Sequence, residues 1–484
     1  MKTKVNAITN YIKNNISFLC ISILVIAAIY EIGRVDVASY QVFKDGLFFK
    51  GSILLLVAVM IIRKVKLLNI PIIATALTWT ALVTNYLYDH NNDWGEQWRE
   101  YLILKAIAYG LILLIVVNMI QTKSISKARV KSPFFWIVLI TFCGAYALEP
   151  AHTLPILCPI LILYLTPIEK EVWHKIEISV AIGVVLAFTV FMIQSLVQAN
   201  DNYIVGRWYG LAGIAQNGAI AALAFSCLLF LLFYNIRVLK KWYITVPILL
   251  ECVFCLYILS RVWSRSGIMA AAFVIVIFAL LTVINTKKRR AIFFSTLAVL
   301  GLVLAVAGTT MVAKIDAEGG DVPNFLRGMR PIAAFFDETI ELEAPESLQG
   351  SGRFWIIMDQ MTSGRVSIWS AGVKQATLLG KNDISVSFGE YFYDHMHNSF
   401  MDWIVRYGWI VGILLNVWFV MLYVKAVWRA KNPGDSFLLF STSFFLAYAM
   451  FDLQGWIVCP GFLLLLLQKP LLTAQEKEEL PCEQ

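Results

Sequence analysis

Residues 213–234 read GIAQNGAIAALAFSCLLFLLFY, and this stretch decides the fold class. It holds no charged side chain, and its length is close to the roughly 20 residues that an α-helix needs to cross a bilayer. The whole chain is similar: its 484 residues are 59% hydrophobic and 15% charged, whereas a soluble domain is about 25% charged. The composition therefore excludes a soluble enzyme, a disordered chain and a disulfide-stapled secreted module. A membrane β-barrel would show alternating segments of about ten residues instead of continuous apolar runs.

About fourteen apolar segments predict an all-α polytopic membrane protein with about 12–14 transmembrane helices. They centre on residues 16–33, 47–62, 69–87, 101–121, 133–149, 153–167, 175–196, 213–234, 243–260, 266–286, 291–313, 408–427, 436–451 and 455–471. We expect helices 1–11 within residues 1–313, one large extracytoplasmic loop with short helices at 314–396, and a re-entry helix, the last three transmembrane helices and a cytoplasmic tail at 397–484. A loop of this length rarely lacks structure or function of its own.

The distribution of Lys and Arg gives the chain an orientation. With the N-terminus inside and strict alternation of spans, the inside segments hold a roughly threefold excess of Lys and Arg over the outside loops, as the positive-inside rule expects. Both termini are therefore predicted to be cytoplasmic. No small-residue cleavage site follows the first apolar segment, which predicts a span and not a signal peptide. The net charge of +8 is assigned to cytoplasmic loops and indicates no nucleic-acid partner.

Two polar features lie inside the apolar segment 243–260. Cys252 and Cys255 have the spacing of a redox motif, but no strand is predicted nearby, so buried free thiols are expected. Glu251 lies near the middle of the same segment. A carboxylate inside the membrane is by default a functional candidate, although no partner for it is evident in the sequence.

Three basic groups fall on the predicted outer side, each next to the end of a span. They are the stretch Arg261–Gly267 in a very short loop, the stretch Ser363–Trp369 within the long loop, and His395–Asn398 where that loop re-enters the membrane. Guanidinium groups bind phosphate with two parallel hydrogen bonds and stay charged. Close to lipid, their attraction for a diphosphate exceeds that in bulk water. The three groups together therefore predict an anionic ligand at the outer interface.

His397 is the candidate for proton transfer, because imidazole titrates near neutral pH. Asn398 is a good N-cap residue, and a short helix is expected from Ser399 to Tyr407, ended by Gly408. The positive end of that helix would lie at His397 and would favour the neutral imidazole. A neutral imidazole can accept a proton as a general base.

Other interpretations of these residues remain open at this point. Arg261 taken alone is also typical of a side chain that anchors a helix among lipid headgroups. His395 and His397, with the adjacent Asp394, could hold a metal ion, but no third ligand stands at a characteristic spacing. Trp369 also fits the aromatic belt of the membrane interface.

The motifs resemble, in the same order, those of the O-antigen ligase/polymerase superfamily of bacterial membrane glycosyltransferases. The shared features span roughly residues 200–460, and the first 200 residues match only in being hydrophobic. The motifs are Ser264-Arg265-Ser266-Gly267 at the start of a span, Ser363-Gly-Arg365-x-x-x-Trp369 with a later Gly380, and His397-Asn398 followed by Gly408 and Gly412.

The resemblance implies transfer of a glycan from an undecaprenyl-diphosphate-linked donor to an acceptor hydroxyl on the outer face of the bacterial cytoplasmic membrane. The transfer would need no metal and no other cofactor. Arg265 and Arg365 would hold the diphosphate, and His397 would deprotonate the acceptor. Further contacts with substrate are predicted for Arg207, Arg261, Arg353, His395, Asn398 and Asp452.

Three activities remain open on the sequence alone. A ligase would use lipid A–core as the acceptor, and a polymerase would use another carrier-linked glycan, with the same donor and the same motifs. A transporter or flippase for a lipid-linked glycan would also need basic groups for the diphosphate. Such a transporter usually shows internal repeats and charged residues at the bilayer midplane, and the sequence has no repeat.

Overall fold

The computed structural model describes residues 136, 139–140, 170–204, 207–210, 213–285, 350–361, 364–381, 386–388, 391–393, 395–430 and 436–450. The long helices are α8 (Lys170–Ala199), α9 (Gly213–Tyr234), α10 (Trp242–Val262), α11 (Arg265–Asn285), α16 (Ser399–Arg429) and α17 (Ser436–Ala449). The shorter elements are the π-helix η3 (Asn235–Leu239), helices α14 (Arg353–Met361) and α15 (Arg365–Gln375), and strands β1 (Tyr203–Ile204), β2 (Arg207–Trp208), β3 (Val386–Phe388) and β4 (Tyr391–Tyr393). Each pair of strands forms an antiparallel hairpin.

The described part of the chain is mostly helical, and five of its helices (α8 to α11, and α16) are long and apolar enough to cross a membrane. This confirms a helical membrane protein. The predicted segment 213–234 coincides with α9, and segments 243–260 and 266–286 lie within two residues of the ends of α10 and α11. The predicted spans before residue 170, apart from residues 136 and 139–140, and those at 291–313 and at 455–471 lie outside the described residues.

Helix α16 is two helices joined at a sharp bend. Gly408 has φ 81° and ψ 170°, which no helix contains, so the short helix 399–407 ends there and a long helix continues to Arg429. This is the short helix that the N-cap Asn398 and the glycine predict. The two parts fold toward one another, because the amide of Asn416 donates to the carbonyl of Phe400 at 3.2 Å.

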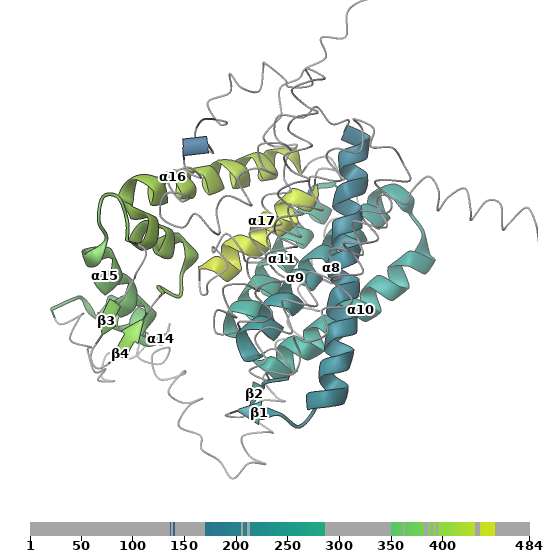
Figure 1. The fold of residues 1–484 in the computed structure, drawn as a ribbon. Helices are drawn as coiled ribbons and strands as arrows, with labels where there is room; N and C mark the ends of the chain where they lie inside the picture. Colours follow the sequence, from purple (N-terminus) through teal and green to yellow (C-terminus); the bar gives the residue numbers. More distant parts are fainter. Residues whose placement is uncertain are drawn as a thin grey trace, which may run out of the picture.

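Helix α9 is the centre of the bundle and packs against α8, α10, α11 and α17 (Figure 1). Ser226 Oγ donates to the carbonyl of Phe440 at 2.9 Å, and the rings of Phe230 and Phe437 lie 5.0 Å apart, so α17 runs antiparallel to α9. At about 1.5 Å per residue, α17 rises about 15 Å from Phe440 to Met450, and α9 rises about 20 Å from its start to Ser226. The C-terminus of α17 therefore lies near the level of the first turns of α9.

Helix α11 runs parallel to α9 and starts at the same level. An added Cβ on Gly267 would lie 2.9 Å from the carbonyl oxygen of Gly218, so the two backbones touch near their N-termini. Helices α10 and α11 are joined only by Trp263 and Ser264. We call this end of the bundle the hairpin end: it holds the β1–β2 hairpin, the starts of α9 and α11, and the ends of α8, α10 and α17.

The described residues between 350 and 396 form a small unit beside the bundle (Figure 1). Helix α15 packs against β3 and against α16, and α14 packs against α15. The side chain of Asp359 on α14 accepts from the backbone N–H of Ser367 at 2.7 Å, which caps the first turn of α15. The cap fixes the direction in which α15, and with it Arg365, enters the site.

Candidate functional site

Arg261 is held inside a set of protein partners at the hairpin end. Its guanidinium donates to the side chain of Asn200 at 2.9 Å, to the carbonyl of Asn200 at 3.1 Å and to the hydroxyl of Tyr203 at 3.0 Å. It also lies 5.1–5.7 Å from the ring centres of Tyr203, Trp208 and Tyr257. These contacts join α8, the β1–β2 hairpin and α10. They give Arg261 a structural role, and its predicted contact with substrate stays a prediction.

Two further predicted arginines lie at the same end. Arg207 is half-buried in β2, next to the fully buried Trp208. Arg265 is the first residue of α11, and the side chain of Ser264 caps this helix by accepting from the backbone N–H of Gly267 at 3.2 Å. In the sequence Ser-Arg-Ser-Gly, Ser264 therefore caps α11, and Gly267 lets the backbone of α9 lie close to that of α11.

Asn398 connects the re-entry helix to the bundle in two ways. Its side-chain oxygen accepts from the backbone N–H groups of Phe400 and Met401 at 3.0 and 3.1 Å, so it is the predicted N-cap. Its side-chain nitrogen donates to the carbonyl of Met450, at the end of α17, at 3.2 Å. The start of α16 is therefore fixed at the hairpin end, level with the start of α11.

Helix α15 is connected directly to the two histidines. The indole N–H of Trp369 donates to the carbonyl of Met396 at 2.7 Å. A Cβ added to Gly372 would meet the sulfur of Met396, so the helix lies against this residue. Arg365 precedes Trp369 by four residues and shares its face of α15. Two motifs that are 30 residues apart in sequence therefore meet at the residue between His395 and His397.

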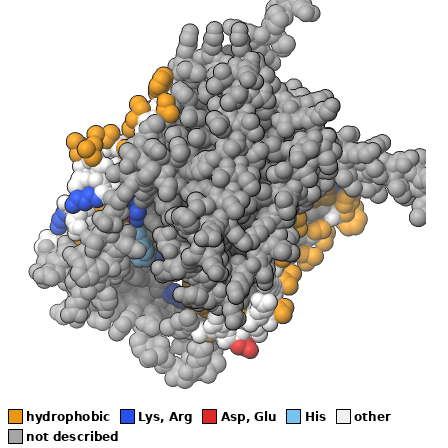
Figure 2. Space-filling view, viewed as in Figure 1, with side chains coloured by type: hydrophobic (Ala, Val, Ile, Leu, Met, Phe, Trp, Pro, Cys, Tyr) orange, Lys and Arg blue, Asp and Glu red, His pale blue; other side chains and the backbone are white. Residues whose placement is uncertain are grey.

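The two histidines form a pair. His395 Nε2 and His397 Nδ1 lie 3.2 Å apart, and the rings meet edge to face with centroids 4.2 Å apart. Both rings are half-buried. His397 has φ 48°, a left-handed conformation that is uncommon outside glycine and that clusters at functional sites. Figure 2 shows histidine atoms at the surface of this side of the molecule, with Lys or Arg atoms near them.

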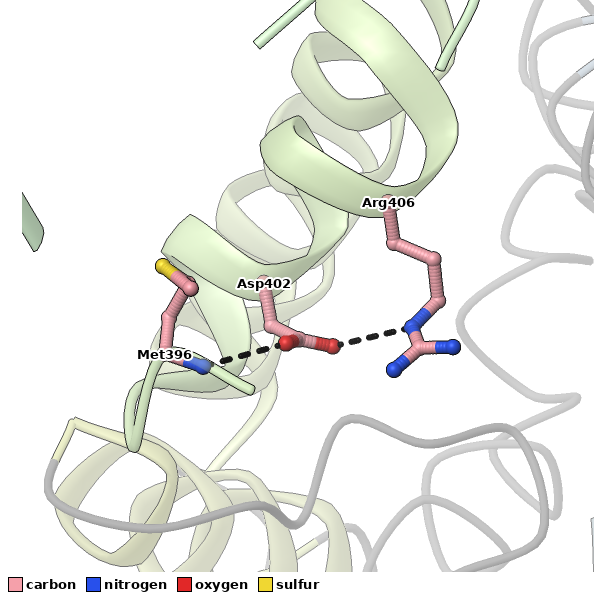
Figure 3. A network of polar contacts seen from close by, with 3 residues as sticks. All are labelled: Met396, Asp402 and Arg406. Atoms are coloured by element: carbon pink, nitrogen blue, oxygen red, sulfur yellow. Dashed lines mark hydrogen bonds and ion pairs between the residues drawn. The ribbon is translucent and has the colours of Figure 1, made fainter. Parts of the chain in front are cut away.

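A buried ion pair on the short helix is bonded to Met396, the residue between the two histidines (Figure 3). Asp402 and Arg406, on the short helix, are 3.4 Å apart, and their residues are 1% and 7% exposed. The other oxygen of Asp402 accepts from the backbone N–H of Met396 at 3.3 Å, and Asp402 interacts electrostatically with His395. The residue between the histidines is thus bound through its N–H by Asp402 and through its carbonyl by Trp369.

The connection after α15 crosses the bend of α16 at two glycines. A Cβ on Gly380 would lie 2.4–2.8 Å from main-chain atoms of residues 406–408, and one on Gly408 would lie 2.3–2.6 Å from main-chain atoms of residues 378–380. The backbones can cross this closely only without side chains at both positions. Three backbone hydrogen bonds form there: Lys381 N to Arg406 O, Trp409 N to Thr377 O, and Ile410 N to Leu378 O.

Two predicted site residues remain, Arg353 and Asp452. Arg353 is half-buried at the start of α14, which reaches the site only through α15. Asp452 lies outside the described residues. Within the described ranges, no group of three or more His, Cys, Asp and Glu side chains could hold a metal ion.

Some hydrogen-bond partners cannot be predicted from the sequence, because they lie far apart in the chain. Thr189 on α8 donates to Glu251 on α10 at 2.6 Å, which supplies the partner that Glu251 lacks in the sequence. Two partners of Arg261, Asn200 and Tyr203, lie about 60 residues earlier in the chain, in the turn after α8 and in β1. The spacing of Asp402 and Arg406 by four residues within a predicted helix is the one local signal that indicates an ion pair in advance.

The structure thus places Arg207 and Arg261 at the hairpin end, where Arg265 is the first residue of α11, and it joins the helix of Arg365 to the segment His395–Asn398, whose Asn398 is bonded to the end of α17. No family model, curated protein or solved structure matches the chain.

Proposed function

We propose that the chain is a membrane glycosyltransferase. It moves a glycan from an undecaprenyl-diphosphate carrier to an acceptor hydroxyl at the outer face of the bacterial cytoplasmic membrane, in the manner of an O-antigen ligase. The main support is the hydrogen bond from the Trp369 indole to Met396, which joins the helix of Arg365 to the His395–His397 pair. Two of the three sequence motifs that resemble the family are thereby in contact.

The proposed chemistry needs one base and a site for the leaving group. The acceptor oxygen attacks the anomeric carbon, the carbon–oxygen bond to the diphosphate breaks, and the electron pair stays on the diphosphate oxygen. Arg265 and Arg365 stabilise the negative charge that develops there, and His397 takes the hydroxyl proton. Donors placed in advance at such a charge contribute about 3–4 kcal/mol each, and a general base contributes about 10²–10⁴-fold in rate.

The orientation in the membrane is part of the proposal. The hairpin end faces outward, because the positive-inside rule applied to the whole chain puts Arg237, Lys240 and Lys241, which follow the other end of α9, in the cytoplasm. The substrate then approaches at the bilayer surface, where the diphosphate of a lipid carrier lies. No nucleotide is required, since the sugar is already activated.

The test is transfer of glycan in membranes that contain the His397→Ala variant. The proposal predicts a loss of at least about 10²-fold in rate, since the base is removed. His174→Ala is the matched control, because His174 is a histidine of α8 whose ring lies 5.8 Å from Tyr234, at the opposite end of α9. Unchanged transfer by His397→Ala would overturn the assignment of the base.

The acceptor is identified by the products. Purified protein is given the carrier-linked glycan with and without lipid A–core. Glycan on lipid A–core supports the ligase, and longer carrier-linked chains without it support a polymerase. Movement of the carrier-linked glycan across a liposome membrane with no acceptor, and with no product formed, would replace the enzyme by a transporter.

A further inference from the structure

We propose that His395 positions His397 and takes a proton from it. His395 holds His397 in the tautomer with the proton on Nδ1. During glycan transfer it receives that proton, while Asp402 supplies the opposite charge. The assignment of the tautomer stands independently of the enzyme activity. The transfer of the proton to His395 rests on the proposed function.

The geometry of the pair limits the tautomers to two. With His395 Nε2 and His397 Nδ1 at 3.2 Å, exactly one of these nitrogens carries a proton when both rings are neutral. If the proton is on His395, then His397 carries its own proton on Nε2 and cannot accept another there. If the proton is on His397 Nδ1, the lone pair of His397 is on Nε2, and the ring can act as a base.

Asp402 favours the second arrangement. Its carboxylate accepts from the backbone N–H of Met396, the amide group that directly follows His395. Nδ1 is the ring nitrogen closer to the main chain, and Nε2 of His395 already faces His397. The electrostatic interaction of Asp402 with His395 therefore favours a proton on His395 Nδ1, which leaves Nε2 as the acceptor from His397.

The proton balance of the transfer follows from this tautomer. The acceptor hydroxyl gives its proton to His397 Nε2 as the new carbon–oxygen bond forms and the diphosphate leaves with its electron pair. His397 then passes its Nδ1 proton to His395 Nε2. His397 is now neutral with its proton on Nε2, and His395 is an imidazolium near Asp402. The starting tautomer returns when water takes the proton from His397 Nε2 and His395 Nε2 gives its proton back to His397 Nδ1. No oxidant, metal or further reactant is needed.

The surrounding charges suit a positive charge on His395. Asp402 is 1% exposed and is already bonded to Arg406 and to the N–H of Met396, so it is fixed in position. The attraction between opposite charges is stronger in a low-dielectric interior than in water. Arg406, 3.4 Å from Asp402, supplies an opposite charge that favours the ionised form of the carboxylate.

The first measurement reads the tautomer directly. The protein is labelled with ¹⁵N-histidine, reconstituted in lipid vesicles, and studied by solid-state NMR. The chain has five histidines, and the signals of the pair are assigned with His395→Gln and His397→Gln. We expect His397 to have a protonated Nδ1 and an unprotonated Nε2. A protonated Nε2 on neutral His397 would overturn the inference whatever the activity of the protein.

The second measurement separates positioning from proton transfer, with glycan transfer as the assay. His395→Gln keeps an oxygen that accepts from His397 Nδ1 but takes no proton, and we expect kcat to fall about tenfold with KM unchanged. His395→Phe keeps the ring shape but offers no acceptor, and we expect a fall of about 10²-fold, the lower limit for general-base catalysis, with partial recovery in added imidazole. Equal losses in both variants through KM alone would contradict the relay. Loss of the proposed function itself would be seen separately, as unchanged activity in His397→Ala.

Discussion

Replacing Gly408 by Ala tests whether the crossing of two backbones holds the site together. Gly408 has φ 81° and ψ 170°, a region that side-chain-bearing residues rarely enter. The new Cβ would also lie 2.3 Å from the backbone nitrogen of Gly380 and 2.6 Å from the carbonyl oxygen of Leu378. Main-chain atoms at this distance cannot rotate away, so one of the two segments has to move.

The expected loss of stability follows from two contributions. The strained conformation of a non-glycine residue costs about 1–3 kcal/mol. Separating the segments breaks the three backbone hydrogen bonds of the crossing, each worth about 1 kcal/mol net. Those bonds lie at the end of the short helix and the start of the long helix, where backbone groups commonly lack intrahelical partners. The free energy of unfolding should therefore fall by about 4–6 kcal/mol.

The assay is equilibrium unfolding in mixed detergent micelles, with the change in helical circular dichroism as the signal. Gly364→Ala is the matched control, because Gly364 has φ 84° but an added Cβ there meets nothing within 4 Å. The control should lose only the conformational part, about 1–2 kcal/mol. If Gly408→Ala lost no more than Gly364→Ala, the close crossing would not contribute to stability, and the reasoning would be refuted.

Three further changes have defined outcomes in the same unfolding assay. Arg261→Lys should lower the unfolding free energy by about 2 kcal/mol, since one ammonium cannot replace the forked hydrogen bonds and ring contacts; an unchanged midpoint would contradict this. Asp402→Asn should lower the unfolding free energy by about 3–5 kcal/mol, because it leaves Arg406 buried without its ion pair. Adding Arg406→Gln should restore part of this free energy, and no recovery in the double variant would refute the pairing. Thr189→Val should cost about 0.6–1.7 kcal/mol and should be non-additive with Glu251→Gln, so a coupling energy of zero would disprove the bond.

The sequence was sufficient for the features that depend on neighbouring residues. The ends of α9, α10 and α11 follow from where long apolar runs stop, because burying backbone in lipid requires a complete helix. The short helix 399–407 follows from a capping asparagine before it and a glycine after it, and the structure confirms both. Each of these predictions rests on contacts within a few residues.

The features that were missed depend on which faces of distant helices meet. The strands of the β1–β2 hairpin are two residues long and carry no alternating pattern, so contacts outside the strands, such as those of Arg261 with Trp208 and of Asn217 with Tyr209, explain their position. The pairing of Thr189 with Glu251 joins residues 62 positions apart. Hydrophobic periodicity reports that a face is apolar, but it does not identify the partner, since most apolar faces in a membrane protein are chemically alike.

The contacts on either side of His397 explain how it keeps an unfavourable backbone conformation. Before it, Met396 is bound through its N–H by Asp402 and through its carbonyl by Trp369 of α15. After it, Asn398 caps the short helix and donates to the end of α17. Three separate elements therefore hold the two neighbours, and a conformation with φ 48° persists only when its surroundings determine it in this way. The role that we propose for His397 requires this rigidity, because a displacement of about 1 Å from the reacting atom can cost about 10²-fold in rate.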